Sequence, residues 1–571
     1  MPEMVLPGVY IEVRAEGLIT PGRVTVGNVG ILGTASKGPV GTPVLLGSAS
    51  EARSVFGPYD LFDDGTKNEL SLVRALELAY ENGASSVFAV RLQSETNPAT
   101  AASYALAAEG GGTSATLEAK TPGTAGNQLA VSVRRPTGTE EGAFVEDETL
   151  AGAATVQLAR KPLTKVTRVR VKSATTAQTK DFLVKDVAEA GAVKPDLTAG
   201  TVAFFAGEAP AAADKVIVSY VVAPASSRLV TVRYKTNTEE QQESFVAADG
   251  THLKELAAAS DLIKVAAAGA DAAKPPAPTQ ADSDPPTFKL FGVGTNPPGS
   301  NGAAVTEAEV KIALELLLNE PVHIVVAAGF GVSKIADELK AHCDAASTDK
   351  MKADRIAVVG IDPKMSFDAA RSHTVDSDRV ILVAPGLKLA DAAPGAAGKE
   401  ITLPGVYMAP VVAGLLSAND PHISLTNKAV AVGALETRYT RAQIEQLVQK
   451  RVLVVEQQPG LGIRIVKGIT TSTNTAFHQI TTRRIVDYAK YGVRSAASPY
   501  IGKLNNERVR GALKSTITSF LQEMLDDEML VAFEVDVFAT RKDEIKGIAN
   551  VTILLQPTFS IDFIKVTMFL S

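Results

Sequence analysis

Both ends of the chain carry the alternation of apolar and polar residues that predicts a β-strand. In the N-terminal segment MPEMVLPGVYIEVR, Val9, Ile11 and Val13 alternate with Tyr10 and Glu12. A strand with one buried face has this period of two. Because an unpaired apolar strand exposes a sticky edge, we expect another strand to cover it, from the same chain or from another copy.

The C-terminal segment QPTFSIDFIKVTMFLS is more apolar and changes phase within its length. Its apolar side chains fall on odd positions up to Phe563 and on even positions from Ile564, through Val566, Met568 and Leu570. Such a change requires a bulge, a bend or burial on both faces. We hypothesise that the part ending at Phe563 pairs within its own domain and that the later part crosses to a neighbouring subunit. The alternative is one strand buried on both faces.

Helical and strand periods alternate in two separate parts of the chain. Leu72, Leu76 and Ala79 recur at helical spacing, and a capping-box pattern from Thr306 to Glu309 opens another helix. Short apolar runs follow these helices, and this order is typical of an α/β domain. The expected elements are helices at residues 68–80, 306–317 and 333–346, and strands at residues 23–35, 85–92, 322–329, 355–362 and 379–386.

The region between these two parts has a different pattern. Residues 95–299 are rich in Ala, Gly and Thr, with short alternating runs separated by turn residues, which predicts a β-rich region. It ends with an expected helix at residues 253–268 and a proline-rich, polar linker at residues 270–287. Because the α/β order resumes afterwards, we interpret this region as an insertion into one α/β domain, with the flanking strands in one sheet.

The C-terminal part combines helices and strands in another order. An apolar stripe that includes Leu513, Ile517 and Leu521 predicts an amphipathic helix at residues 505–530, and a shorter helix is expected at 440–449. Strands are expected at residues 452–457, 462–469, 529–540 and 548–557. The expected fold class is α/β and α+β multidomain: a split α/β core domain with a β-rich insertion, and an α+β C-terminal domain.

Composition limits the class of protein. The 571 residues are 45% hydrophobic and 21% charged, which is typical of a globular chain with several domains. A single cysteine, Cys343, excludes an intrachain disulfide and a zinc site built from several cysteines. No uninterrupted apolar run approaches the roughly 18 residues of a membrane span, and no leader pattern opens the sequence. We expect a chain made in a cytoplasm, without membrane insertion.

Charge is distributed unevenly along the chain. The net charge of −6 argues against a dedicated nucleic-acid binder, yet residues 438–514 hold 14 Lys and Arg against four Asp and Glu. One interpretation is a basic face in contact with solvent. The other is a face that meets an acidic partner, because clustered charge of one sign steers association.

The sequence carries no recognisable catalytic or ligand motif. Its six histidines lack metal-ligand spacing, and GILGTASKG lacks the order of a phosphate-binding loop. His342 and Cys343 are adjacent, which places them about 100° apart on a helix and favours a structural role. We therefore expect no cofactor, no metal and no enzymatic activity.

Several motifs occur in the order found in one known family. PGVYIEVRAEG, GILGTASKGPVGTPVLLGSASEARSVFG and TPGTAGNQLAVSV lie in the first quarter of the chain. VVAGLLSANDPHISLTNKAV and RRIVDYAKYGVRSAASPYIGKLNNERVRGALKSTITSFLQEML lie in the last third. Together they resemble the contractile phage tail sheath proteins. This resemblance implies a structural subunit that polymerises as stacked rings around an inner tail tube and contracts to drive the tube through an envelope.

The resemblance also implies partners and contact residues. The partners are further copies of this chain, the inner tail tube protein, and baseplate and tail terminator proteins, in a virion tail assembled in the host cytoplasm, with no direct nucleic-acid contact. In the family, both terminal arms donate strands to sheets of neighbouring subunits. The residues expected to exchange strands are Val9, Tyr10, Ile11, Val13, Ile564, Val566, Met568 and Leu570. The residues expected to face the tube are Arg438, Arg441, Lys450 and Arg451.

The expected domain division has six parts, with the insertion on the outer surface. They are an N-terminal strand-donating arm (1–20), the first part of the α/β core (21–94), the inserted region (95–299), the second part of the core (300–399), the C-terminal sheath domain (400–557) and a C-terminal strand-donating arm (558–571). Two other functions stay open: a different strand-exchanging shell or filament protein, and an α/β enzyme that binds a phosphate ligand.

Overall fold

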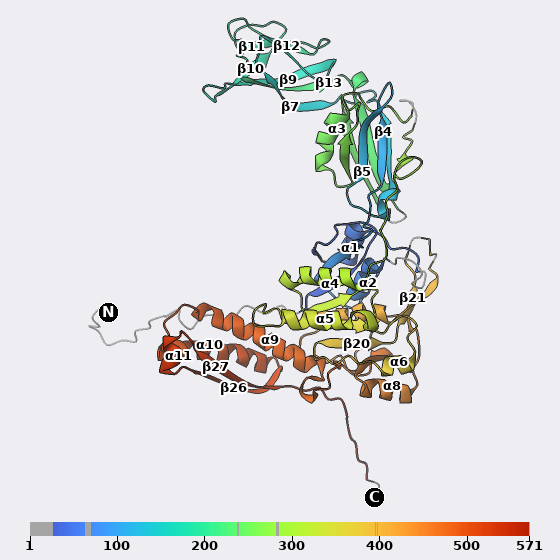
Figure 1. Cartoon of the computed structure of the whole chain (residues 1–571), viewed down its shortest axis with the longest axis vertical. Helices are drawn as coiled ribbons and strands as arrows, with labels where there is room; N and C mark the ends of the chain where they lie inside the picture. Colours follow the sequence, from blue (N-terminus) through green and yellow to red (C-terminus); the bar gives the residue numbers. More distant parts are fainter. Residues whose placement is uncertain are drawn as a thin grey trace, which may run out of the picture. The chain divides into compact units, whose positions relative to one another are not determined.

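The computed structural model describes residues 27–569, apart from residues 63–69, 237–238, 281–284, 394 and 397. These residues form two compact units of mixed α/β structure (Figure 1). Unit 1 comprises the described parts of Met1–Ala35, Pro39–Gln93 and Ala304–Ser571. Unit 2 comprises the described parts of Ser36–Gly38 and Ser94–Ala303.

Unit 1 is built on an eight-stranded sheet. In spatial order its strands are β2 (Val44–Leu46), β3 (Val87–Leu92), β1 (Val29–Thr34), β18 (Ile324–Ala327), β19 (Ile356–Gly360), β20 (Val380–Ala384), β24 (Val452–Gln458) and β25 (Gly462–Ile465). The six inner strands are parallel and the two edge strands are antiparallel to their neighbours. Strand β1 pairs with β3 on one side and with β18 on the other. Strands β24 and β25, which lie in the part predicted as the C-terminal sheath domain, belong to this sheet.

Helices cover both faces of this sheet, which explains why its strands are runs of apolar residues rather than alternating ones. One face packs on α1 (Ala49–Phe56), α2 (Ser71–Glu81) and α7 (Met408–Ala418). The other face packs on α4 (Glu307–Leu316), α5 (Val332–Ala346), α6 (Phe367–Arg371) and α8 (Arg441–Gln449). The predicted capping box at Thr306 and Glu309 is present at the start of α4.

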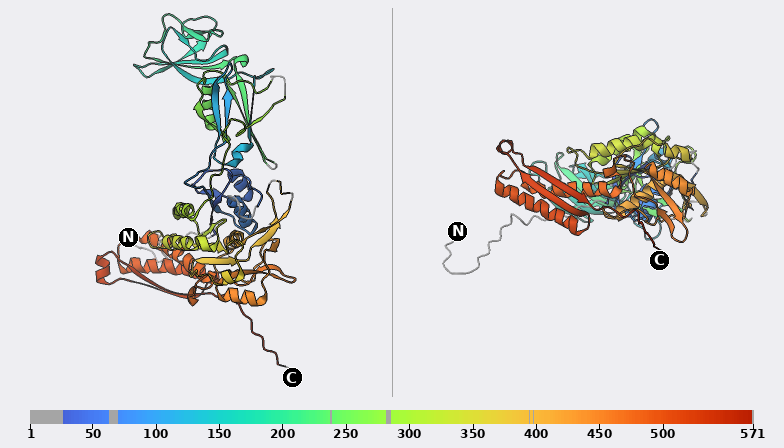
Figure 2. Two further views of the ribbon diagram at one scale, coloured as in Figure 1. Left: turned by 45° about the vertical axis from the view of Figure 1, so that its right-hand side comes forward. Right: turned by 90° about the horizontal axis from the view of Figure 1, so that it is seen from below.

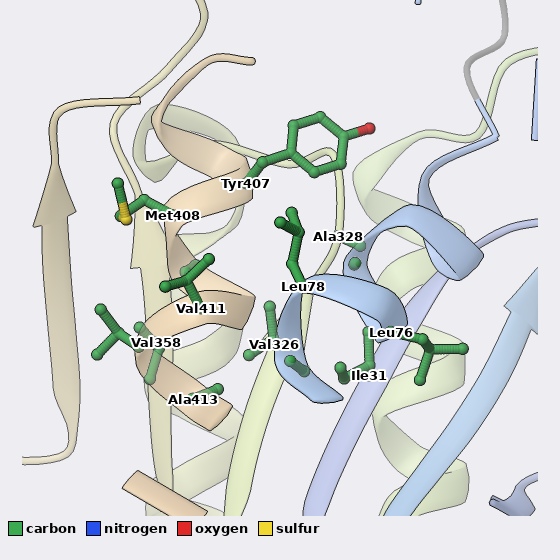
Figure 3. Packing of buried hydrophobic residues seen from close by; sticks show 14 of the residues in the cluster. Ile31, Leu76, Leu78, Val326, Ala328, Val358, Tyr407, Met408, Val411 and Ala413 are labelled. Atoms are coloured by element: carbon green, nitrogen blue, oxygen red, sulfur yellow. The ribbon is translucent and has the colours of Figure 1, made fainter. Parts of the chain in front are cut away.

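Helix α7 approaches α2 closely over the first face. Leu78 of α2 and Val411 of α7 lie in one apolar cluster with Val326 and Val358 of the strands (Figure 3). A β-carbon on Gly414 of α7 would lie 2.3 Å from the carbonyl oxygen of Ala79. Only glycine therefore permits this approach.

The last part of unit 1 is a helix pair packed on a hairpin (Figure 2). Helices α9 (Ile480–Ala497) and α10 (Glu507–Asp526) are followed by β26 (Leu530–Phe538), α11 (Arg541–Ile545) and β27 (Asn550–Pro557). The predicted stripe is confirmed, since Leu513, Ile517 and Leu521 are buried. Helix α10 ends earlier than predicted because Leu530 starts β26. A small sheet of β22 (Glu400–Leu403), β21 (Leu387–Ala390) and β23 (Ala434–Leu435) completes the unit.

Unit 2 is made mainly of three antiparallel or mixed sheets and one helix, α3 (Gly250–Leu256). The seven-stranded sheet contains β7 (Phe144–Ala151), β13 (Lys215–Val222), β9 (Leu163–Lys172), β10 (Thr179–Val184), β11 (Ala192–Asp196), β12 (Thr201–Phe204) and β8 (Thr155–Gln157). The four-stranded sheet contains β15 (Glu240–Ala247), β14 (Arg228–Lys235), β6 (Leu129–Arg134) and β17 (Lys289–Leu290). The three-stranded sheet contains β16 (Ile263–Ala268), β5 (Thr113–Ala119) and β4 (Ser103–Ala107).

The helix predicted at residues 253–268 is wrong in its second half. Helix α3 ends at Leu256, and β16 follows, antiparallel to β5. Strand pairing buries Ile263 completely, so a tertiary contact outweighs the helical preference of the alanines in this segment.

Candidate assembly surfaces

The hairpin of β26 and β27 is an unfinished sheet. Its strands pair with each other, and within the described residues neither outer edge has a strand partner. One face lies on α10, but its apolar side chains are only partly buried: Phe533, Val535, Val537, Ile553 and Leu555. Two strands alone make a marginal sheet, and open edges present unpaired N–H and C=O groups. The hairpin can therefore accept a further strand on each side.

Residues 558–569 follow β27 without forming a helix or a strand. The side chains predicted to exchange strands are exposed here: Ile564 by 83%, Val566 by 71% and Met568 by 85%. Leu570 lies outside the described residues. The expected strand pairing of the part up to Phe563 within its own domain is wrong, because this part joins no sheet. Its most extensive contacts with the rest of the chain come from one acidic side chain.

That side chain belongs to Asp562. Its carboxylate accepts hydrogen bonds from Gln479 Nε2 at 3.2 Å and Thr426 Oγ1 at 3.4 Å, and its Oδ2 lies 3.3 Å from Lys467 Nζ. The hydroxyl of Ser560 donates to the same carboxylate at 3.1 Å. The first three donors come from separate segments: the turn after α7, the chain after β25 and the residue before α9. We call these three residues and Asp562 the arm clasp.

The predicted N-terminal coupler cannot be placed in the same way. Val9, Tyr10, Ile11 and Val13 lie outside the described residues. Their role in strand exchange stays a prediction that rests on the alternation of their side chains.

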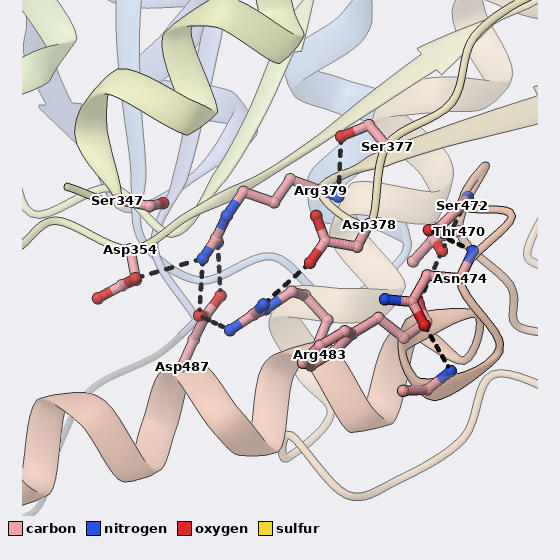
Figure 4. A network of polar contacts seen from close by, with 12 residues as sticks. Ser347, Asp354, Ser377, Asp378, Arg379, Thr470, Ser472, Asn474, Arg483 and Asp487 are labelled. Carbon is pink, nitrogen blue, oxygen red and sulfur yellow. Dashed lines mark hydrogen bonds and ion pairs between the residues drawn. The ribbon is translucent and has the colours of Figure 1, made fainter.

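Several cations of the basic stretch at residues 438–514 pair with acidic residues of unit 1, and Figure 4 shows the contacts of Arg483. Arg379, next to β20, donates to both carboxylate oxygens of Asp487 on α9, at 2.8 and 3.1 Å. Arg483 of α9 donates to Asp487 at 2.6 Å and to Asp378 at 2.9 Å. These contacts join α9 to the ends of the sheet strands.

A second carboxylate extends this network. Asp354, whose side chain is fully buried, accepts a hydrogen bond from Arg494 Nη1 at 2.5 Å and forms an ion pair with Lys490. Burial by itself raises the pKa of Asp354, but the hydrogen bonds from Lys490 and Arg494 outweigh it and leave the pKa below its ordinary value. Asp354 therefore stays ionised at neutral pH and holds the middle of α9.

Other cations of the basic stretch also have acidic partners. The ion pairs are Lys467 with Asp562, Arg510 with Glu544, and Lys514 with Asp536. Most of these acids lie outside residues 438–514, so counting charge along the sequence overstates the free positive charge.

Four cations near α8 behave differently. Arg438, Arg441 and Lys450 are exposed and Arg451 is half-buried. None of the four forms an ion pair with another described residue of the chain. They remain available to a partner, and their contact with a tube stays a prediction.

The adjacent His342 and Cys343 of α5 are both buried. Burial lowers the pKa of His342 to about 3 and raises the pKa of Cys343 to about 12, so neither group is charged at neutral pH. Among the described residues, no three His, Cys, Asp or Glu side chains gather where they could hold a metal ion. No helix in the same part of the chain is long and apolar enough to cross a membrane.

Family models match two adjoining segments of the chain. The phage tail sheath protein central domain matches residues 303–471, and the phage tail sheath C-terminal domain matches residues 472–571. Over residues 303–571 the chain belongs to the phage tail sheath protein family. Its role is accordingly that of a structural component of a tail sheath, and the resemblance seen in the sequence motifs is confirmed.

Two solved structures share the fold over nearly the whole chain. The sheath tail protein from Desulfitobacterium hafniense has a TM-score of 0.55 and 16% identity, covering 96% of this chain and 100% of its own. The sheath tail protein from Listeria innocua has a TM-score of 0.55 and 14% identity, covering 96% of this chain and 95% of its own. No curated protein matches the sequence.

The arm clasp and the α9 network were not predicted. Asp562 carried a signal, because it is the one acidic residue in the apolar run of residues 559–570 and stands next to the change of phase. No local sequence pattern indicated the Arg379–Asp487 pair, because its two residues lie 108 positions apart.

Proposed function

We propose that this sheath protein polymerises helically around an inner tail tube through exchanged strands, and contracts to drive the tube through the envelope of a target cell. The observation that supports this proposal is that one chain holds both an open sheet and an exposed apolar segment. The predicted division into six parts belongs to the same proposal, as do the baseplate and terminator partners and the location in a virion tail assembled in the host cytoplasm.

The donor and the acceptor have matching patterns. Ile564, Val566 and Met568 recur every second residue, as do Val535 and Val537 on the α10 face of the hairpin. A strand added at an edge would place its even-numbered side chains on this face and complete their burial. Each main-chain hydrogen bond contributes only about 1 kcal/mol, but two arms per subunit hold every copy at several points.

Two variants with equal numbers of changes test the donor. In the even set, Ile564, Val566 and Met568 are each replaced by serine. In the odd set, Lys565, Thr567 and Phe569 are each replaced by serine. We expect the even set to give a folded, soluble subunit without tubes in electron micrographs, because only these side chains face α10. The odd set should still form tubes. Removal of residues 565–571 should act like the even set, and normal tubes from that truncated chain would refute strand exchange.

The α8 region supplies the proposed tube contact. Reversing the charges of Arg438 and Arg441 to Glu should weaken co-assembly with tube protein in low salt, because attraction between charged faces is strongest there. Lys334→Glu with Lys350→Glu changes the net charge equally at other exposed sites and serves as the control. Equal co-assembly of both variants, measured by co-sedimentation, would remove α8 from the tube contact. Polymers that never associate with tube protein would favour the alternative of another strand-exchanging filament.

A further inference from the structure

The C-terminal segment is exposed on both sides of one largely buried side chain, that of Asp562. Ile561 and Phe563 expose 81% and 84% of their surfaces, whereas the side chain of Asp562 exposes 10%. Apolar burial cannot explain this arrangement, because the apolar neighbours point into solvent. The segment is held by the contacts of the Asp562 carboxylate and by the Lys467 ammonium, which also lies 5.2 Å from the centre of the Phe563 ring.

The groups around Asp562 are arranged as donors. Thr426 Oγ1 accepts from Gly468 N at 3.2 Å and from Ser424 Oγ at 3.1 Å, so its own proton is left for Asp562. Gln479 is buried and turns its Nε2 amide donor to the carboxylate. With the Lys467 ammonium, three donors converge on one acceptor. Such a set fits an ionised carboxylate and does not fit a neutral amide of the same size.

The position of the clasp along the chain is as specific as its chemistry. The phase of the apolar pattern changes between Phe563 and Ile564, one residue beyond Asp562. The eight residues from Ile564 to the last residue span about 26 Å when extended, which is enough for a strand of ordinary length. The clasp therefore lies at the boundary between the body and the segment that would be donated.

We propose that Asp562 is the positioning residue of the C-terminal arm. The clasp fixes the point at which the arm leaves the body. Residues 564–570 therefore meet the hairpin of a neighbour with part of their conformational freedom already restricted. This lowers the entropy that assembly must remove and raises the local concentration of the donor strand. The inference rests on the proposed strand exchange and adds the residue that directs it.

The test uses the full chain with Asp562→Asn. This change keeps the size of the side chain but sets an amide N–H₂ among three donors, so the clasp opens. We expect the melting temperature of the subunit to change little and the concentration at which tubes first form to rise about tenfold. Ser560→Ala removes one donor to the same carboxylate but leaves the three donors of the clasp, and it should assemble close to the unchanged chain.

A second measurement reports on the arm directly. A spin label on Thr567→Cys should become more mobile in the unassembled subunit when Asp562→Asn or Lys467→Gln is present, while Cys343 is buried and stays unlabelled. If Asp562→Asn lowers the melting temperature, Lys467→Gln, which leaves the carboxylate in place, decides between a folding defect and a positioning defect through the same two readouts.

The outcomes separate this inference from the function beneath it. If the even-set variant forms no tubes but Asp562→Asn and Lys467→Gln assemble at the unchanged concentration with unchanged label mobility, Asp562 does not position the arm and strand exchange stands. If the even-set variant assembles normally, the proposed strand exchange itself fails. A raised assembly concentration together with a more mobile label supports the clasp.

Discussion

The eight-stranded sheet and the β26–β27 hairpin differ in how completely their strand edges are paired and their apolar side chains are buried. In the sheet, the inner strands are paired on both edges and covered by helices on both faces, so Val358 and Leu382 have no exposed surface. In the hairpin, both outer edges lack a strand partner among the described residues and only one face packs on α10, so Leu554 exposes 64% of its surface. Burial that is complete within the chain stabilises the subunit, whereas the incompletely buried hairpin is where the proposed strand exchange would take place.

The largest expected effect is a loss of unfolding free energy caused by a substitution inside the eight-stranded sheet. Leu382→Ala in β20 should lower the free energy of unfolding by about 3 kcal/mol, because it leaves a cavity in a packed core. Leu554→Ala in β27 should change it by less than about 0.5 kcal/mol, because the side chain is already in contact with water. Urea unfolding of the unassembled subunits measures both values. Similar losses from the two variants would remove the distinction between the two regions.

The next effect concerns the polar contacts that join the two regions. Arg379→Met leaves Asp487 and Asp354 in a buried site with fewer partners, and should cost about 3 kcal/mol. Lys514→Met removes an exposed ion pair with Asp536 and should cost less than about 0.5 kcal/mol. Hydrogen exchange of α9 amides should rise in the first variant only. A small cost for Arg379→Met would mean that α9 is held by apolar packing alone.

The smallest effect is a pH dependence of stability, expected in the eight-stranded sheet and its helices but not in the hairpin. Burial, together with the nearby Arg355, lowers the pKa of His342 to about 3. As pH falls below about 6.5, the unfolded chain binds the proton first, so the stability that depends on neutral His342 is complete above that pH and declines toward pH 3. At pH 5 we expect a loss of about 1–2 kcal/mol.

His342→Asn is the matched variant for this pH dependence. Its urea midpoint should fall less steeply than that of the unchanged chain between pH 6.5 and pH 4.5. The hairpin and its helices from residue 498 onward contain no histidine, so their amides should show no corresponding pH-dependent exchange. Equal slopes for the two chains would assign the acid sensitivity to other groups.

Local pattern determined much of this protein from its sequence. Runs such as Ile356–Gly360 and Val380–Ala384 indicated strands, and the periodicity of Leu513, Ile517 and Leu521 indicated the apolar stripe of α10. Short motifs in a fixed order indicated the family. These features depend on neighbours within a few residues, so the sequence alone displays them.

Other features were decided by contacts between distant residues. Residues 263–268 became a strand because β5 was there to pair with them. The cations of α9 pair with Asp354 and Asp378, which lie more than 100 residues earlier in the chain. Asp562 accepts a hydrogen bond from Thr426, which lies 136 residues earlier. A side chain's partner depends on where the whole chain brings its segments together, and no local period encodes that, so only the tertiary structure shows which charges are free and where the arm begins.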